Sequence, residues 1–149
     1  MKLEYKVMEQ KDIERVIPLY IEYWNSTGDN WTPEITYKRI WQVVGSPDSL
    51  SILAYNGDEV IGFAMGRFEA FYDLTGYNLV EIVVAKAHQN KGLGTIIMQE
   101  LERRVKALGG KMVHLDAVND DIHEHFYTKL GYKNVTNFKA LKQTKINSK

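Results

Sequence analysis

The stretch AHQNKGLGTII, residues 87–97, places two glycines one residue apart, between an apolar run and a helix-like pattern. The first N–H groups of a helix have no partner inside the helix, and together with the helix dipole they form a binding site for anions. Gly92 and Gly94 leave room for a bulky phosphate to approach the backbone, and glycine allows the φ values that such a loop needs. The stretch therefore predicts a phosphate-binding loop at the start of a helix.

Two other phosphate-binding loops and a simple turn are the alternatives. A P-loop requires Lys followed by Ser or Thr after the glycines, and neither pair follows here. A dinucleotide-binding loop requires a third glycine where Ile97 stands and a turn directly after the strand, although Asp116 lies at a suitable distance for a ribose. The remaining alternative is that the glycines only shape a turn, because a bare G-x-G pattern has low specificity.

The composition is that of one globular domain. The 149 residues are 44% hydrophobic and 26% charged, and we find no internal boundary, so we expect a single domain over residues 1–149 with a frayed tail at 142–149. Nineteen basic and nineteen acidic side chains give a formal net charge of zero, so no global field attracts nucleic acid or membrane lipid. The absence of cysteine excludes disulfides, thiolate zinc sites and a cysteine acyl-enzyme. Without a long apolar segment, we expect a soluble, cytoplasmic protein.

The first half of the chain predicts a strand, two helices and an antiparallel hairpin. Residues 3–7 alternate as a short strand, and a helical series follows in which Pro18 is expected to introduce a kink. That series consists of Ile13, Val16, Ile17, Tyr20 and Trp24. A second helical series consists of Tyr37, Ile40, Trp41 and Val44, and Gly45 ends it. Asn56-Gly57 then joins two β-rich runs, and it indicates a hairpin because both residues accept positive φ.

The second half predicts a strand–helix–strand crossover followed by one more helix and strand. Residues 77–85 form a long apolar strand interrupted only by Glu81, and residues 111–118 form the next strand. The helix between them carries Leu93, Ile97, Leu101, Val105 and Leu108 on one face. Residues 120–132 predict a helix with Asp121 and Glu124 spaced like a capping box, and with Ile122, Phe126 and Leu130 on one face. With a last strand at 135–141, the fold class is α+β with a mixed sheet and a parallel right-handed crossover.

Two segments together resemble the GNAT family of N-acetyltransferases. QNKGLG, residues 89–94, matches the Q/R-x-x-G-x-G/A segment that binds the pyrophosphate of acetyl-CoA in that family. FYTKLGY, residues 126–132, matches a later F/L-Y-x-K-L-G-F/Y segment whose tyrosine lies near the thioester sulfur. The order of elements matches over essentially the whole chain. The resemblance implies a mixed, mostly antiparallel sheet with a parallel β-α-β crossover in its centre, helices on both faces, and acetyl-CoA (coenzyme A) as cofactor.

The resemblance also implies which residues contact the cofactor. The pyrophosphate is expected on the N–H groups of residues 89–94, where Lys91 adds charge at the rim or is an ordinary solvated lysine. A backbone N–H of Val83 or Val84, where pantetheine pairs like an extra strand, is expected to polarise the thioester carbonyl. Asp120 stands where the family often has an asparagine that contacts pantetheine. The expected set is Val83, Val84, Gln89, Asn90, Lys91, Gly92, Leu93, Gly94, Thr95 and Asp120.

Tyr127 and Glu81 are the expected catalytic acid and base. A phenol with a pKa of about 10 can protonate a leaving thiolate whose thiol has a pKa of about 8.5; the alternative is an amphipathic tyrosine that covers the core. Glu81 is the only charge in a buried strand, and a buried carboxylate is costly unless it has a partner or a task. We expect it to take the amine proton through water; the alternatives are that it pairs with a lysine or arginine or faces solvent.

The acceptor is expected near the aromatic side chains of residues 20–41 and near the loop before the long strand. Aromatic faces beside carboxylates suit a cationic amine. The expected acceptor-binding residues are Trp24, Trp31, Tyr72 and Asp73; the alternative for the aromatic rings is packing in the core or in a homodimer contact. A metal site is not expected, because His123 and His125 lie two apart on a helix and face different directions.

These residues predict direct transfer of an acetyl group from acetyl-CoA to a primary amine of a small, cationic molecule. The reaction is expected in one ternary complex, because no cysteine is present to carry the acyl group. The expected partner is therefore a small-molecule amine, with no nucleic acid and no membrane. The alternatives are a protein or peptide N-acetyltransferase and a non-catalytic module that senses CoA or binds a protein.

Overall fold

The structure is a computed structural model that describes residues 1–146. Residues 147–149, the end of the tail expected at 142–149, lie outside the described residues. The chain divides into two compact units, Met1–Asp116 and Ala117–Lys149. The expectation of a single domain stays a prediction, and each unit is considered by itself below.

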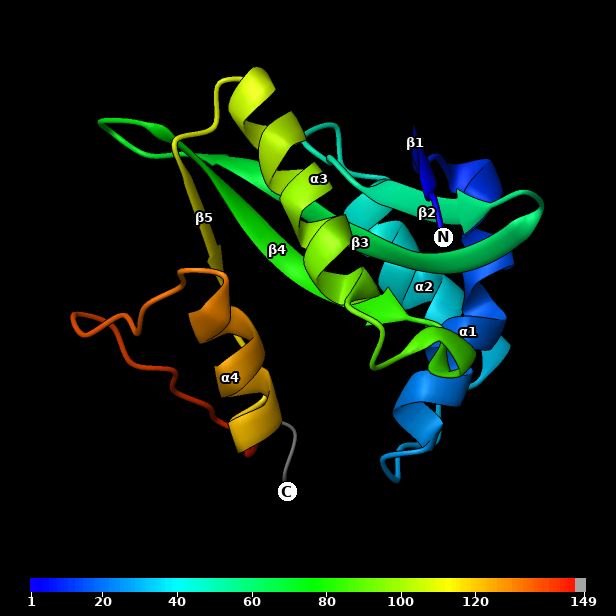
Figure 1. Ribbon diagram of the computed structural model, residues 1–149. Coiled ribbons are helices and arrows are strands. Elements are labelled where there is room, and N and C mark those ends of the chain that lie inside the picture. The colour runs from blue at the N-terminus through cyan, green and yellow to red at the C-terminus, as the bar shows by residue number, and fades with distance from the viewer. Residues whose placement is uncertain (147–149) are drawn as a thin grey trace. The chain divides into compact units, whose positions relative to one another are not determined.

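The first unit is built on a five-stranded sheet in the order β1-β2-β3-β4-β5 (Figure 1). Its strands are β1 (Glu4–Val7), β2 (Ile52–Asn56), β3 (Glu59–Ala70), β4 (Thr75–Val84) and β5 (Met112–Leu115). Neighbouring strands are antiparallel except β4 and β5, which run parallel. The mixed, mostly antiparallel sheet with a parallel crossover is therefore confirmed.

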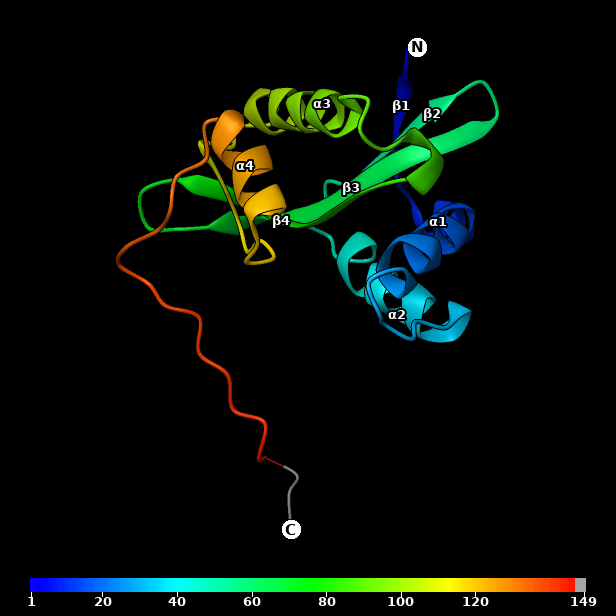
Figure 2. The ribbon, with the colours of Figure 1, turned by 60° about the horizontal axis from the view of Figure 1, so that its bottom comes forward.

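Helices cover both faces of this sheet (Figure 2). α1 (Ile13–Asn25) and α2 (Pro33–Val44) lie on one face, and α3 (Leu93–Ala107) lies on the other. The short 3-10 turns η1 (Gln10–Asp12) and η2 (Lys86–His88) come before α1 and α3. α1 continues through Pro18 as one helix.

The hydrophobic core between the sheet and the α1–α2 pair positions the inner residues of β4. Its buried members are Met8, Ile13, Val16, Leu19, Tyr20, Ile40, Val43, Val44, Leu53, Phe63, Met65 and Val83. On the opposite face, α3 buries Leu93, Ile97, Met98, Leu101 and Val105. Leu108, expected on that helix face, is instead 64% exposed because α3 ends at Ala107.

The β2–β3 hairpin turns one residue later than the sequence pattern predicts. Asn56 pairs with Glu59 as the last residue of β2, so the loop consists of Gly57 and Asp58. Gly57 has a φ of +63°, whereas Asn56 does not have a positive φ. A glycine at the first loop position gives the left-handed turn that fits the twist of the strands. The hairpin therefore depends on Gly57 rather than on the Asn56-Gly57 pair.

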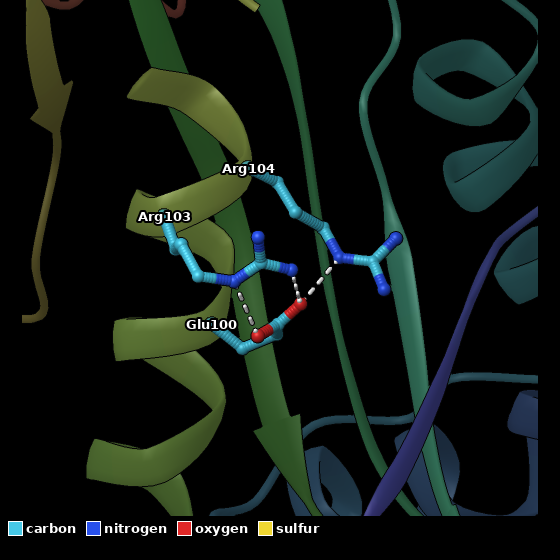
Figure 3. A network of polar contacts seen from close by, with 3 residues as sticks. All are labelled: Glu100, Arg103 and Arg104. Carbon is cyan, nitrogen blue, oxygen red and sulfur yellow. Dashed lines mark hydrogen bonds and ion pairs between the residues drawn. The ribbon is translucent and has the colours of Figure 1, made fainter. Parts of the chain in front are cut away.

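A charged network lies on α3 (Figure 3). The Oε2 atom of Glu100 accepts hydrogen bonds from Nη2 of Arg103 at 2.7 Å and from Nε of Arg104 at 2.6 Å. The Oε1 atom accepts from Nε of Arg103 at 3.0 Å. Hydrogen bonds from Arg103 and then Arg104 outweigh the opposing effect of burial and lower the pKa of Glu100 to about 2.

The second unit contains α4 (Asp121–Lys129), which ends before Gly131 at a φ of +95°. The expected capping box at Asp121 and Glu124 is wrong by one residue, because the N-cap is Asp120. Its side chain accepts the backbone N–H of His123 at 2.7 Å. The cap forms at Asp120 because its backbone is extended, with φ −145° and ψ 168°, so that its carboxylate reaches the free N–H groups of the first turn.

The strand predicted at residues 135–141 is wrong. Residues 132–146 contain no helix and no strand. Their apolar side chains Val135, Phe138 and Leu141 are 60%, 81% and 88% exposed. These residues recur every third position, whereas the side chains of a strand alternate with a period of two, so they do not line one strand face.

Candidate active site

The loop between β4 and α3 has the backbone shape of an anion-binding site. Gly92 is the N-cap of α3 with a φ of +76°, and Asn90 has a φ of +62°. The first helical hydrogen bond runs from the N–H of Ile96 to the carbonyl of Gly92. The N–H groups of Leu93 to Thr95 come before that bond, and no side chain within residues 1–146 caps them. They are therefore available to an external anion.

The space in front of Gly92 is open. A Cβ built at this position meets no atom within 4 Å. A ligand can therefore approach the backbone at the point where any other residue would place a side chain. This observation fits a phosphate group at the start of α3, as the sequence predicts.

The other predicted cofactor-binding residues of this loop differ in exposure and in their contacts. Gln89 fastens the loop to β4, because its Nε2 donates to the carbonyl oxygen of Val84 at 3.1 Å. Leu93 is buried in the core and offers only its backbone. Asn90 and Lys91 are exposed, and Thr95 is half-buried.

β4 extends beyond β5 and leaves part of one edge open. β5 pairs only with Gly76–Leu79 of β4, whereas β3 pairs with β4 as far as Val84. Within the sheet that the structure describes, residues 80–84 have no strand on the β5 side. Val80 is an extra residue in the β3–β4 register, and such a bulge bends a strand locally.

The direction of the backbone groups distinguishes Val83 from Val84. The N–H of Ala85 donates to the carbonyl of Ile61 at 2.8 Å and so points toward β3. Because backbone groups alternate in direction along a strand, the N–H of Val83 also faces β3 and that of Val84 faces the open edge. Of the two donors that the sequence left open, only Val84 has its N–H on the open edge of β4.

Glu81 lies on the face of β4 that α1 and α2 cover, and its side chain is only 10% exposed. Its Oε2 atom accepts hydrogen bonds from the hydroxyl of Tyr20 at 2.8 Å and from Nε of Arg39 at 3.1 Å. Burial raises the pKa of Tyr20, and the carboxylate of Glu81 raises it further. Burial disfavours the charge of Arg39, but Glu81 outweighs this effect and raises the pKa of Arg39. Glu81 thus has the arginine partner that the sequence left as an alternative, and its role as a base stays a prediction.

Two of the predicted acceptor-binding residues lie beside this cluster. The ring of Trp31 meets the ring of Tyr20 edge-on with centroids 5.1 Å apart, and the ring of Trp24 lies 6.4 Å from the same ring. Nε1 of Trp31 donates to Asp29 at 3.0 Å. Nε1 of Trp24 is buried and has no hydrogen-bond partner among residues 1–146.

The other two predicted acceptor-binding residues lie elsewhere in the first unit. Tyr72 and Asp73 belong to the turn between β3 and β4, and Tyr72 is fully exposed. Glu81 lies six residues along β4 from Thr75, where that strand begins, which corresponds to about 20 Å of strand. The structure therefore does not bring Tyr72 and Asp73 to Glu81.

The predicted residues of the second unit have well-defined local contacts. The Oδ1 atom of Asp120 accepts both the backbone N–H and Nδ1 of His123, each at 2.7 Å. These bonds, the backbone bond first, lower the pKa of Asp120. The ring of Tyr127 meets the rings of Phe126 and Tyr132 edge-on at 4.9 and 5.7 Å. The tyrosine of the FYTKLGY segment is thus held between two aromatic neighbours from the same segment.

A comparison with known families identifies the chain. The sequence model of the acetyltransferase (GNAT) family matches residues 14–132. The chain belongs to this family. The resemblance seen in the QNKGLG and FYTKLGY segments is thereby confirmed, and GNAT membership makes acyl transfer the class of activity. No curated protein matches the sequence.

Solved acetyltransferase structures have the same fold at low sequence identity. A GNAT family acetyltransferase of Staphylococcus aureus is 19% identical with a TM-score of 0.72, covering 97% of this chain and 99% of its own. A ribosomal-protein-alanine N-acetyltransferase of Brucella melitensis is 12% identical with a TM-score of 0.75, covering 95% and 100%. An aminoglycoside acetyltransferase from a soil metagenome, solved with sisomicin, is 14% identical with a TM-score of 0.71, covering 95% and 97%. At these identities the similarity establishes the fold alone.

Membrane-spanning helices and metal-binding clusters are both missing from the described part of the chain. No helix within residues 1–146 has the length and apolar character needed to span a membrane. The same residues contain no group of three or more His, Asp or Glu side chains arranged to hold a metal ion.

Proposed function

We propose that this GNAT chain transfers an acetyl group from acetyl-CoA to a primary amine of a small, cationic molecule, in one ternary complex. The observation that carries the proposal is the start of α3. There, the free N–H groups of Leu93 to Thr95 and the open space at Gly92 come one loop after the open edge of β4. The anion site at the start of α3 suits the phosphate end of a phosphopantetheine arm, and the open edge of β4 suits the extended chain that leads to the thioester.

Acetyl-CoA would be held by the loop and the strand edge together. The N–H groups from Gly92 to Thr95 would bind the pyrophosphate, and Lys91 would add positive charge at the exposed rim. The pantetheine arm would pair with the open edge of β4, where the N–H of Val84 is the donor for the thioester carbonyl oxygen. Gln89 would keep this loop at a fixed distance from the strand through its bond to the Val84 carbonyl.

The transfer would need one base and one acid. The amine nitrogen forms a bond to the acetyl carbon, the carbon–sulfur bond breaks, and the products are an acetylated amine and the free thiol. Glu81 would take the proton that the amine loses, directly or through water, and Tyr127 would give a proton to the leaving sulfur. Exchange with water then returns both residues to their starting state.

The proposed acceptor follows from the aromatic side chains beside Glu81. Trp24 and Trp31 are partly buried, pack against the core, and contact the ring of Tyr20, which binds Glu81. Aromatic rings near a carboxylate form an arrangement that binds ammonium groups. The structural neighbour solved with sisomicin is an aminoglycoside acetyltransferase, and aminoglycosides carry several primary amines. That likeness supports a polycationic amine as the first acceptor to test.

The test is an acetylation assay with free-thiol detection. Wild-type protein is incubated with acetyl-CoA and separate pools of aminoglycosides, polyamines and peptides with free N-termini. We expect thiol release with a small cationic amine, and we expect Glu81→Gln and Tyr127→Phe to lower it by about 10²- to 10⁴-fold. Tyr55→Phe, which removes a phenol hydroxyl on β2, is the control and keeps the wild-type rate.

Each other outcome of the assay leads to a different conclusion. Turnover only with peptides would make the chain a peptide N-acetyltransferase. CoA binding without turnover on any amine would make it a sensor or interaction module. Unchanged turnover in Tyr127→Phe would remove the proposed acid.

A further inference from the structure

We infer that Tyr20 and Arg39 are positioning residues that hold Glu81 through one carboxylate oxygen, so that only its other oxygen is free to take the proton of the acceptor amine. The inference rests on the proposed function, in which Glu81 is the base. Neither Tyr20 nor Arg39 belongs to the motifs that bind the cofactor, and Arg39 was not found by the sequence analysis.

The two donors converge on the same atom. The hydroxyl of Tyr20 and Nε of Arg39 both donate to Oε2 of Glu81, at 2.8 and 3.1 Å. Among the residues that the structure describes, no hydrogen bond or ion pair to Oε1 is found. The carboxylate therefore has one occupied oxygen and one free oxygen, and the free one has the lone pairs that a proton transfer requires.

The two donors come from different helices and differ in their freedom to move. Tyr20 of α1 is only 1% exposed, and its ring is fixed by the edge contact with Trp31 and by Phe63 at 6.4 Å. The side chain of Arg39, from α2, is 43% exposed. The buried phenol therefore sets the direction of the carboxylate, and the guanidinium supplies the charge that a buried carboxylate needs.

The position of Glu81 in β4 explains why it needs such support. The residue lies next to the bulge at Val80, where the regular ladder with β3 is interrupted. A bulge changes the aim of neighbouring side chains. Two hydrogen bonds from outside the sheet restore a single orientation at this point. A base must be held within about 0.5 Å of its productive position, which makes orientation a requirement for transfer rather than a detail of packing.

A purely structural ion pair is the competing explanation, and a double-mutant cycle separates the two. If Tyr20 acts only through Glu81, then Tyr20→Phe lowers kcat in the wild type but has no further effect once Glu81 is replaced by Gln. If Tyr20 only supports the fold, its removal has the same effect on kcat in both backgrounds.

The experiment measures kcat, the KM for the amine, and CoA affinity by calorimetry. The variants are Tyr20→Phe, Arg39→Met, Arg39→Lys, and each of these combined with Glu81→Gln. We expect Tyr20→Phe and Arg39→Met to lower kcat by about 10- to 100-fold, with unchanged CoA affinity. Arg39→Lys, which keeps the charge, should recover part of the loss. Tyr37→Phe, which removes another hydrogen-bonded phenol hydroxyl from α2, is the matched control and keeps the wild-type kcat.

Each result leads to one conclusion. Equal losses of kcat with Glu81 and with Gln at this position, or wild-type kcat in Tyr20→Phe and Arg39→Met, would overturn the inference and leave the proposed function intact. Wild-type protein that binds CoA but acetylates no amine would overturn the proposed function, and the inference with it.

Discussion

Replacing Gly92 by alanine separates the backbone role of this glycine from its role toward the ligand. Gly92 has a φ of +76°, and a Cβ there meets no protein atom within 4 Å. The added methyl group therefore causes no clash inside the protein. It does force a left-handed backbone on a residue with a Cβ, which costs roughly 1–2 kcal/mol of stability.

Gly57→Ala is a matched control for this cost. Gly57 has a φ of +63° and also has no atom within 4 Å of a Cβ position, but it lies in the β2–β3 turn. Both variants should lose a similar free energy of unfolding, which corresponds to a fall in Tm of about 2–4 °C per kcal/mol for a chain of this length. Only Gly92→Ala places the methyl group where the pyrophosphate is proposed to bind.

The assay compares the Kd for CoA by isothermal calorimetry and Tm by scanning calorimetry in both variants. Losing one hydrogen bond to a charged phosphate costs about 1.5–3 kcal/mol, which raises the Kd by roughly 10- to 100-fold. We therefore expect similar Tm values for Gly92→Ala and Gly57→Ala, and weakened CoA binding only in Gly92→Ala. Equal CoA affinity in the two variants would refute the assignment of the loop.

Three further predictions concern stability. The pKa of Glu100 is about 2 in the folded protein, against an ordinary value of 4.5, so the stabilising effect of this carboxylate is complete above pH 4.5 and is lost as the pH falls toward 2. The difference in unfolding free energy between wild type and Glu100→Gln should therefore shrink as the pH falls over that range. A difference that stays constant with pH would contradict this prediction. Tyr77→Phe should cost about 1–3 kcal/mol in urea unfolding because the carbonyl of Leu50 then loses its buried donor; an unchanged midpoint would contradict this. Asp120→Ala should destabilise α4 through loss of the N-cap, read as faster amide exchange in its first turn, whereas unchanged exchange would show that the cap is dispensable.

Periodic patterns in the sequence were sufficient to predict most of the fold. The helical series before Gly45 and the series from Leu93 to Val105 both appear as helices, and the first ends at Gly45 as expected, whereas α3 ends at Ala107, before Leu108. These predictions succeed because each segment is long enough to show one buried face. The turn at Gly57 was misplaced by one residue, because the dipeptide signal does not say which of its two residues takes the positive φ.

The prediction of a strand at residues 135–141 is wrong for a different physical reason. Its β-branched and aromatic residues have strand propensity, but they recur every third position and do not form a strand face. The three-residue spacing of these apolar side chains, rather than their composition, decides against a strand in this segment.

The candidate site was only partly predictable. The backbone shape at Gly92 is predictable from local sequence, because glycine readily takes the positive φ that this residue has at the start of α3. The contact from Arg39 to Glu81 joins residues 42 positions apart, and no local pattern contains such a pair. The requirement for a partner at Glu81 was visible, since it is a lone charge in an apolar strand, but the identity of that partner depends on how α2 packs on the sheet.

The most direct test of the central claim is a titration of ¹⁵N-labelled protein with coenzyme A, followed by amide NMR shifts. We predict the largest shifts at Gly92, Leu93, Gly94 and Thr95, with a further shift at Val84 on the open edge of β4 and none at Gly57. Saturable binding that leaves the amides of Gly92 to Thr95 unmoved would contradict the claim that the start of α3 holds the pyrophosphate.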